Sequence, residues 1–423
     1  MPIFPLYPRW LTFSLFAALL FFAPLARGAV QPWAQAVMMA GACLLAAALL
    51  VEKALTGAVI LPRTALDKPF LALAVLFGLS LAFGQARDDG FEALALLAVY
   101  AVIFYAARHL AANRAGQRHV VYLLITLAAV VALIALFKRF SPQLTPVWWH
   151  YDGLSSGNST AGPYGNHNHL AGLLEMIIPL VFGLFLTRPR RGPALFLLLY
   201  LAILLVTTHI LALSRGGWFS LSVGLLIMIA TLLAQKRFTR KKLLLGITGG
   251  LLLVFLFILA STHVVERFLT MTDEGAVLDL AGRVTAWKGC LRMIAAHPFL
   301  GTGPGSFSAL FPAWQPPGIT VRFFYAHNDY LQYAAELGLA AVAIILWIVV
   351  ILARLVIKQA SQPSRQIWGI SFGAGIGILT IILHSFVDFN LHIPANAAVF
   401  AALLGLLLSN SHSGVGNSHE RIR

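Results

Sequence analysis

Long apolar runs recur along the chain and are separated by short polar stretches that contain glycine, proline and charged residues. A helix that crosses a bilayer needs roughly 20 predominantly apolar residues, so the pattern predicts about twelve spans and an all-α, polytopic membrane protein. The predicted spans lie near 10–30, 33–51, 69–85, 92–107, 119–138, 168–187, 193–213, 217–234, 242–262, 331–353, 367–386 and 393–409.

The composition agrees with this pattern. Of the 423 residues, 59% are hydrophobic and only 11% are charged, and the mean hydropathy of +0.84 exceeds that of soluble globular proteins. Basic residues are concentrated in alternate loops, for example at 188–191 and 236–242, so the positive-inside rule predicts that both termini are cytoplasmic. Attraction of these loops to anionic lipid headgroups explains the net charge of +15, and nucleic-acid binding is not predicted.

Two outer loops interrupt the predicted bundle, at about 139–167 and 263–330. Together with the spans, these loops form a single transmembrane helical domain over residues 1–408. Residues 409–423 contain too little apolar surface to pack, so we expect them to form a disordered cytoplasmic tail.

The larger outer loop is too long to lack structure. Within it, Val284, Trp287, Leu291 and Ile294 recur at spacings of three and four. This spacing predicts an amphipathic helix at the membrane interface, with Arg283 at its N-terminal end. An ordinary helix that packs on the bundle is an equal alternative. The following stretch, Gly-Thr-Gly-Pro-Gly-Ser-Phe at 301–307, lacks the lysine of a nucleotide-binding loop, and we interpret it as a set of tight turns.

Arg215 lies between two apolar runs, in the stretch Leu211–Trp218. A permanent positive charge at a membrane boundary is costly and is by default functional. Gly216 and Gly217 follow directly, and glycine allows a backbone to approach a ligand closely. The pattern predicts that this turn binds an anion beside the bilayer.

His327 lies before the tenth predicted span and is followed by polar residues that could fix its orientation. Two further polar clusters, at 162–172 and 384–392, fall on the same predicted outer face, together with Arg215 and Arg283. Histidine titrates near neutral pH, so any proton chemistry or metal binding is expected on this face.

Several of these elements together resemble the O-antigen ligase/polymerase superfamily. The matching elements are Ser214–Gly217, Arg283 with Trp287, His297-Pro298 with 301–307, and His327–Leu331 followed by Glu336–Gly338. Residues 165–172 also resemble the family's Gly-Asn-Pro-Asn-His-Leu-Ala-Gly pattern, except that His167 stands where proline is usual. The similarity covers about residues 150–400, in the family's order.

The resemblance implies a glycosyltransferase of the bacterial inner membrane with a GT-C-like helical fold and a periplasmic active site. The implied donor is a glycan linked to undecaprenyl pyrophosphate. The implied acceptor is a sugar of lipid A-core for a ligase, another lipid-linked glycan for a polymerase, or a pilin hydroxyl for a protein oligosaccharyltransferase. Membrane lipids are further expected partners, and neither a cofactor nor a metal ion is expected.

The resemblance also implies residue roles. Arg215 and Arg283 would bind the pyrophosphate, and His327 would be the general base in a reaction that inverts the anomeric carbon. Arg139 and Arg322 are weaker candidates for phosphate contacts, with lipid-headgroup contact as an equal alternative. The remaining candidates for contacts with glycan or pyrophosphate are Asn166, Asn168, Asn328, Tyr330 and Asp388. For Asp388, a structural salt bridge is the alternative.

Other interpretations remain open. A metal site could use His167, His169, His327 and Asp388, although their spacing is not diagnostic of one. We favour a ligase because we expect no large C-terminal outer domain. Loss of a ligase would leave full-length glycan on its lipid, whereas loss of a polymerase would leave single repeat units. A flippase or transporter would be expected to carry charges in the middle of its spans, and few or none are expected there.

Overall fold

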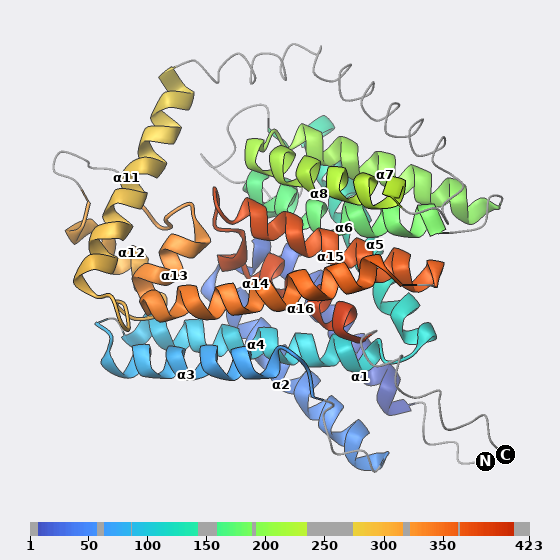
Figure 1. Cartoon of the computed structure of the whole chain (residues 1–423), viewed down its shortest axis with the longest axis horizontal. Coiled ribbons are helices and arrows are strands. Elements are labelled where there is room, and N and C mark those ends of the chain that lie inside the picture. Colours follow the sequence, from blue (N-terminus) through green and yellow to red (C-terminus); the bar gives the residue numbers. More distant parts are fainter. Residues whose placement is uncertain are drawn as a thin grey trace.

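The computed structural model describes residues 7–56, 63–85, 87–142, 159–187, 192–234, 274–315, 322–362 and 364–409. All regular elements in these ranges are helices, with η marking 3-10 helices (Figure 1). They are α1 (Tyr7–Leu25), η1 (Arg27–Ala29), α2 (Pro32–Leu55), α3 (Asp67–Phe83), α4 (Arg87–Leu110), α5 (Arg114–Phe140), η4 (Gly162–Tyr164), α6 (His167–Thr187), α7 (Pro193–Leu211), α8 (Arg215–Ala234), α11 (Glu274–Ala296), α12 (Phe307–Leu310), η5 (Phe311–Ala313), α13 (Asp329–Leu337), α14 (Leu339–Ala360), α15 (Arg365–His384), η6 (Asn390–His392) and α16 (Pro394–Ser409).

The predicted all-α membrane architecture is confirmed in outline. Among the described residues, eight helices are long and apolar enough to cross a membrane, and two shorter apolar helices occur at Arg9–Leu25 and Pro394–Ser409. The protein is therefore a multi-pass membrane protein. The predicted span 242–262 and residues 410–423 of the predicted tail lie outside the described residues. The count of about twelve spans and the sidedness stay predictions.

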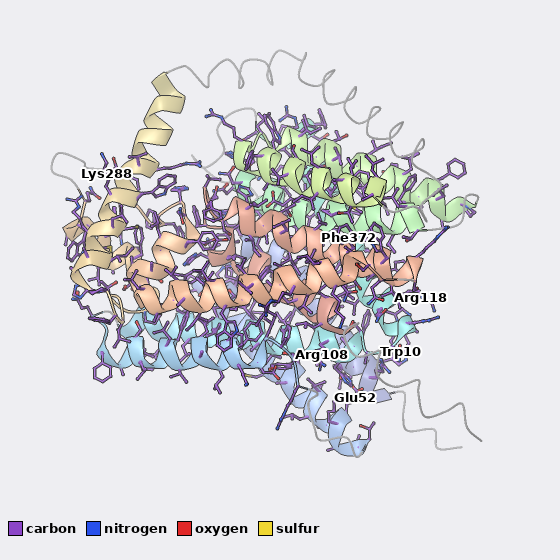
Figure 2. All side chains as sticks on the ribbon, viewed as in Figure 1. Trp10, Glu52, Arg108, Arg118, Lys288 and Phe372 are labelled. Carbon is purple, nitrogen blue, oxygen red and sulfur yellow. The ribbon has the colours of Figure 1, made fainter. Side chains whose placement is uncertain are left out.

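Charged side chains occupy opposite ends of the molecule. Figure 2 shows Lys288 on α11 at one end, and Arg118 on α5 and Glu52 on α2 toward the other. The predicted topology places Lys288 outside and Arg118 inside the cell. Their separation along the bundle agrees with that topology.

The centre of the bundle is the contact between α6 and α15. In Figure 1, α14, α15 and α16 lie between α3 and α4 on one side and α7 and α8 on the other. A Cβ on Gly183 would lie 2.0 Å from the carbonyl oxygen of Gly369, and a Cβ on Gly377 would lie 2.0 Å from that of Met176. Small residues allow helix backbones to approach this closely in membranes. The seam between α6 and α15 therefore fixes the position of the end of α15, where the site lies.

The larger outer loop contains a helix that packs on its neighbours. Ala286, Cys290 and Met293 of α11 are buried in a cluster with Phe307, Phe311, Ala326 and Ala335. Leu291, which was predicted to lie on the apolar face, is instead 55% exposed. These contacts support the alternative of an ordinary packed helix, and a position at the membrane interface stays a prediction. The expected position of Arg283 is wrong, because α11 begins at Glu274 and Arg283 lies inside it.

The tenth predicted span is also wrong at its start, because it is divided into two helices, α13 and α14. The chain turns at Gly338, whose φ is +78°. The backbone N–H of Leu339 donates to the carbonyl oxygen of Pro298 at 2.8 Å, so the 298–305 loop occupies the turn. A side chain at Gly338 would be strained and would also clash, which explains why the apolar run does not continue as one helix.

We predict that Gly338→Ala destabilises the protein. The backbone of Gly338, with φ +78° and ψ −178°, is open essentially only to glycine and costs another residue about 1–3 kcal/mol, and the new Cβ would lie 2.2 Å from the carbonyl oxygen of Phe299. The unfolding midpoint in detergent should fall. Gly78→Ala in α3 is the matched control, because nothing lies within 4 Å of its Cβ, and alanine favours a helix. Equal midpoints for the two variants would contradict this account of the turn.

Candidate active site

The turn that follows α15 connects the elements of the candidate site. We call residues 384–388 the His384–Asp388 turn. The carbonyl oxygen of His384 accepts the backbone N–H groups of Val387 at 2.9 Å and Asp388 at 3.1 Å. The N–H of Asp329, the first residue of α13, donates to the carbonyl oxygens of Ser385 and Asp388. The segment that carries His327 is therefore fixed to this turn through backbone hydrogen bonds.

The imidazole of His327 faces the carboxylate of Asp388. His327 Nδ1 lies 3.9 Å from Asp388 Oδ1, with the His327 side chain 32% exposed and that of Asp388 only 1% exposed. The backbone of His327 has a φ of +50°, a conformation that is uncommon for a residue with a side chain. A partly exposed imidazole beside a buried carboxylate is suited to proton transfer, because the carboxylate can stabilise the protonated ring.

Asp388 is ionised in this setting. Burial alone would raise the pKa of its carboxyl group, but the charges of His327, His169, His384 and Arg283 outweigh burial and hold the pKa below its ordinary value. Asp388 Oδ1 also accepts the backbone N–H of Phe389 at 2.7 Å. The carboxylate is therefore oriented toward His327 and carries a full negative charge at neutral pH.

Arg283 reaches the same turn from α11. Its NH1 donates to the carbonyl oxygen of Val387 at 2.7 Å. One turn further along α11, Trp287 Nε1 donates to the carbonyl oxygen of Ala326 at 3.0 Å. These two bonds attach α11 to the turn and to the residue before His327. Arg283 and His327 are therefore brought together as predicted, although Arg283 lies inside a helix rather than at its start.

Arg215 begins α8, directly after a tight turn from α7. Leu213 closes that turn with a φ of +58°. A Cβ on Gly216 would lie 2.8 Å from Val387 Cγ2 and 2.8 Å from the ring atoms Cδ2 and Nε2 of His384. The absence of a side chain at Gly216 thus lets the first turn of α8 pack on the His384–Asp388 turn. Arg215 lies at the helix N-terminus, whose partial positive charge adds to its own.

Three of the predicted asparagine and tyrosine contacts, Asn166, Asn328 and Tyr330, use their side chains in hydrogen bonds within the protein. Asn166 Oδ1 accepts the backbone N–H of Asn168 at 2.8 Å, where α6 begins. Asn328 caps α13 by accepting the N–H of Leu331, and its amide donates to the carbonyl oxygen of Phe386. The hydroxyl of Tyr330 donates to the carbonyl oxygen of Ile382 at 2.6 Å. These groups hold the loops of the site, and a role in glycan binding stays a prediction.

The two weaker arginine candidates have other neighbours. Arg139 NH1 donates to Thr160 Oγ1 at 3.3 Å, and the guanidinium carbon of Arg322 lies 5.0 Å from the ring centre of Phe324. These contacts do not connect either arginine to the His384–Asp388 turn. A phosphate contact by Arg139 or Arg322 stays a prediction.

The glycine-rich stretch 301–307 forms the predicted tight turns. Gly301, Gly303 and Gly305 all have positive φ. The backbone N–H groups of Gly305 and Phe307 donate to the carboxylate of Glu336 at 3.0 and 3.3 Å. A carboxylate of the chain itself thus occupies the position that a phosphate would take in a nucleotide-binding loop. Burial raises the pKa of Glu336, against the lowering effects of His392 and of these hydrogen bonds.

Sequence reasoning missed an aromatic contact at the centre of the site. The ring of Phe389 stacks on Tyr325 at 4.1 Å with an interplanar angle of 8°. The rings of His169 and His327 each meet Phe389 edge-on at 4.9 Å. Phe389 therefore places the start of α6 beside the general-base candidate. No sequence signal distinguishes this phenylalanine from the other 28.

A second missed group lies inside the bundle. Glu175 is in the interior of α6 with a fully buried side chain. Its Oε1 lies 3.1 Å from His384 Nδ1, and its Oε2 accepts the hydroxyl of Ser220 at 2.8 Å. Glu175 is thus a charge in the middle of a predicted span, where few or none were expected. A single acid in the apolar run 168–187 is a signal that could have found it.

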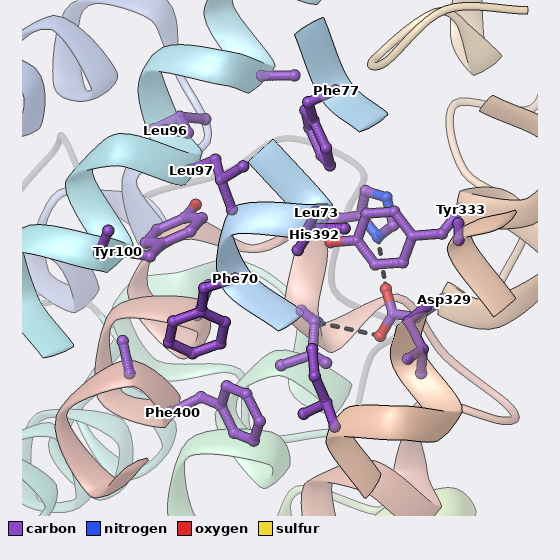
Figure 3. Close-up of a pocket in the computed structure, with 18 of the residues that line it drawn as sticks. Phe70, Leu73, Phe77, Leu96, Leu97, Tyr100, Asp329, Tyr333, His392 and Phe400 are labelled. Carbon is purple, nitrogen blue, oxygen red and sulfur yellow. Dashed lines mark hydrogen bonds and ion pairs between the residues drawn. The ribbon is translucent and has the colours of Figure 1, made fainter. Parts of the chain in front are cut away.

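A cavity of about 430 Å³ opens on the other side of Asp329, lined mainly by apolar side chains of α3, α4, α14 and α16. Figure 3 shows Asp329, Tyr333 and His392 together on one side of it, and Phe70, Tyr100 and Phe400 on the other. His392 Nδ1 is hydrogen-bonded to Asp329 Oδ1. Burial lowers the pKa of His392, but the hydrogen bond and charge of Asp329, with Glu336, raise it above its ordinary value.

Within the ranges that the structure describes, there is no group of three or more histidine, cysteine, aspartate or glutamate side chains that could hold a metal ion. The alternative of a metal site at His167, His169, His327 and Asp388 gains no support from this arrangement. The observation that favours a proton-transfer pair is the partly exposed imidazole of His327 beside the buried carboxylate of Asp388.

Residues 200–348 match the family model of the O-antigen ligase. The match confirms the resemblance to the O-antigen ligase superfamily. No curated protein matches the chain. The matched O-antigen ligase segment contains Arg215, Arg283 and His327, and it supports a glycosyl-transfer enzyme of the ligase/polymerase type. The His384–Asp388 turn and Glu175 lie outside it, so their place in the site follows from the contacts described above.

Proposed function

We propose that the protein transfers a glycan from undecaprenyl pyrophosphate to a sugar hydroxyl of lipid A-core at the periplasmic face of the bacterial inner membrane. The observation that carries this proposal is the His384–Asp388 turn. His327 faces Asp388, Arg283 donates to Val387, and the helix turn that begins with Arg215 packs on Val387. One imidazole and two arginines around one turn match the needs of this reaction, a base for the acceptor and positive charge for the leaving group.

The reaction is a single displacement. The acceptor hydroxyl oxygen attacks the anomeric carbon, and the bond from that carbon to the pyrophosphate oxygen breaks, which inverts the anomeric configuration. Nδ1 of His327 faces Asp388, so Nε2 is the atom that takes the hydroxyl proton. The negative charge of Asp388 stabilises the imidazolium that results. No metal ion takes part in this scheme.

The two arginines act on the leaving group. Undecaprenyl pyrophosphate departs with the bonding electrons, and charge builds up on its oxygens. Guanidinium groups match phosphate oxygens bidentately, and charges that are in place before the reaction need no reorganisation during it. The N-terminus of α8, at Arg215, adds donors and a partial positive charge. The apolar cavity beyond Asp329 offers a surface for the lipid part of a substrate.

The alternatives differ in the acceptor or in the class of activity. A polymerase or a protein O-oligosaccharyltransferase would use the same donor, base and arginines. A lipid-linked glycan flippase would need no base. The absence of charges in the middle of the spans was an argument against transport, and Glu175 inside α6 weakens it. Glu175 contacts His384, however, and His384 belongs to the turn that carries Asp388. Transfer by the purified protein separates an enzyme from a flippase.

We predict that purified protein in buffer with a metal chelator transfers glycan from undecaprenyl pyrophosphate, and that Arg215→Ala and His327→Ala each lower the rate at least about 100-fold. The arginine variant loses charge at the leaving group, and the histidine variant loses the base. Lys288→Ala, an exposed basic residue of α11, is the control and should retain the wild-type rate. Full transfer by either alanine variant, or a need for added divalent ions, would contradict the proposed mechanism.

Asp388→Asn should lower the transfer rate, but by less than His327→Ala, because general base catalysis contributes a factor of about 10²–10⁴ to the rate. The asparagine keeps an acceptor for the N–H of Phe389 but loses the negative charge. The carboxylate stabilises protonated His327, so its removal lets the imidazole stay neutral at lower pH. The acidic limb of the pH–rate profile should therefore move to lower pH. The pKa of Asp388 is held below its ordinary value, so its carboxylate is already charged in the wild type. If the acidic limb of the pH–rate profile does not move in Asp388→Asn, Asp388 does not stabilise protonated His327.

A further inference from the structure

Glu175 connects four helices in the interior of the bundle. Its side chain is fully buried, and His384 at 3.1 Å is 1% exposed. Ser220 of α8 donates to its second oxygen at 2.8 Å, and His209 Nε2 of α7 lies 3.8 Å from the same oxygen. The contacts therefore join α6 to α7, α8 and α15 through one carboxylate.

An acid in this position is expensive. A buried carboxylate loses its hydration, and the contacts that it gains often only offset that loss, so well-packed apolar residues would frequently be as stable. Ionisable groups inside membrane-spanning helices are rare for the same reason, and they tend to serve function. Glu175 therefore calls for an explanation beyond the cohesion of the bundle.

His384, the partner of Glu175, supports three parts of the site. Its ring lies against Gly216, next to Arg215, so closely that a Cβ there would be 2.8 Å from Nε2. Its carbonyl oxygen accepts the N–H groups of Val387 and Asp388. Val387 in turn accepts the hydrogen bond of Arg283. The position of the His384 ring and backbone therefore bears on both arginines and on Asp388.

We propose that Glu175 is a positioning residue of the transferase site: by holding His384, it fixes the distance between the Arg215 turn and the Val387 carbonyl that anchors Arg283. The inference rests on the proposed function, because it assumes that the two arginines bind one pyrophosphate. Glu175 itself does not touch substrate, since its side chain is enclosed by His384, Ser220 and His209. Its influence passes through His384.

The chain offers a matched set of variants. Glu175→Leu keeps the approximate volume and removes the contact with His384. Glu175→Gln keeps an oxygen that can accept from His384, and its amide can donate to Ser220, whose hydroxyl also reaches the carbonyl oxygen of Gly217 at 3.1 Å. Thr380→Val is the control, because Thr380 donates to the backbone carbonyl of Glu175 at the same α6–α15 contact and does not touch the carboxylate.

The experiment measures binding of undecaprenyl pyrophosphate to the purified full-length protein in detergent, together with the unfolding midpoint of each variant. We expect Glu175→Leu to weaken binding at least tenfold. Glu175→Gln should bind within about threefold of the wild type, as should Thr380→Val. A purely structural role would instead make affinity follow the midpoint across all three variants. Recovery of affinity by glutamine at equal stability is the signature of positioning through the hydrogen bond.

Two results would overturn the inference: wild-type affinity in a folded Glu175→Leu protein, or equal losses for the leucine and glutamine variants. If Glu175→Leu does not give a monodisperse protein, His384→Asn replaces it, because asparagine can still donate to Glu175 but lacks the ring that packs on Gly216. Weakened binding by His384→Asn is expected, and unchanged binding would overturn the inference. Failure of the wild type to bind undecaprenyl pyrophosphate more tightly than Arg215→Ala would instead refute the proposed function.

Discussion

The site depends on one set of backbone hydrogen bonds, those of the His384–Asp388 turn. The N–H groups of Val387 and Asp388 donate to the carbonyl oxygen of His384. The other carbonyl oxygens of the turn accept hydrogen bonds from the backbone N–H of Asp329 and from the side chains of Asn328 and Arg283. Elements far apart in the sequence are joined at five consecutive residues. Polar backbone groups at the end of an apolar helix must find partners in any case. Here those partners are the segments that carry the chemistry, so the requirement to satisfy the backbone also assembles the site.

The sequence was sufficient to select most residues of the candidate site, but not to predict the tertiary contacts between them. Arg215, Arg283 and His327 stand in short motifs, and spacing and resemblance were sufficient to select them. Phe389 and Glu175 were missed because their roles exist only through tertiary contacts, with Tyr325 in one case and His384 in the other. Glu175 stands between apolar neighbours in the sequence, but it was missed because attention was given to the charges at helix ends.

In the fold, too, local features were predicted and features that depend on distant contacts were missed. Hydrophobic runs predicted most helices within a few residues, since run length against bilayer thickness is a strong signal. The break at Gly338 was missed because its cause is the 298–305 loop, which lies nearly forty residues earlier in the chain and receives the backbone N–H of Leu339. In α11, the predicted apolar face, with Leu291, differs from the buried face of Ala286, Cys290 and Met293. The spacing of large apolar residues does not indicate which smaller side chains are buried against a neighbour.

The central claim is that two arginines and one histidine around the His384–Asp388 turn act on the same pyrophosphate-linked glycan. An experimental structure of the protein with undecaprenyl pyrophosphate tests it most directly. The account predicts pyrophosphate oxygens at about 2.7–2.9 Å from guanidinium nitrogens of both Arg215 and Arg283, the usual length of such charged hydrogen bonds. It also predicts His327 Nε2 on the open side, facing the position of the acceptor hydroxyl. A pyrophosphate bound away from this turn, or held by only one of the two arginines, would contradict the account.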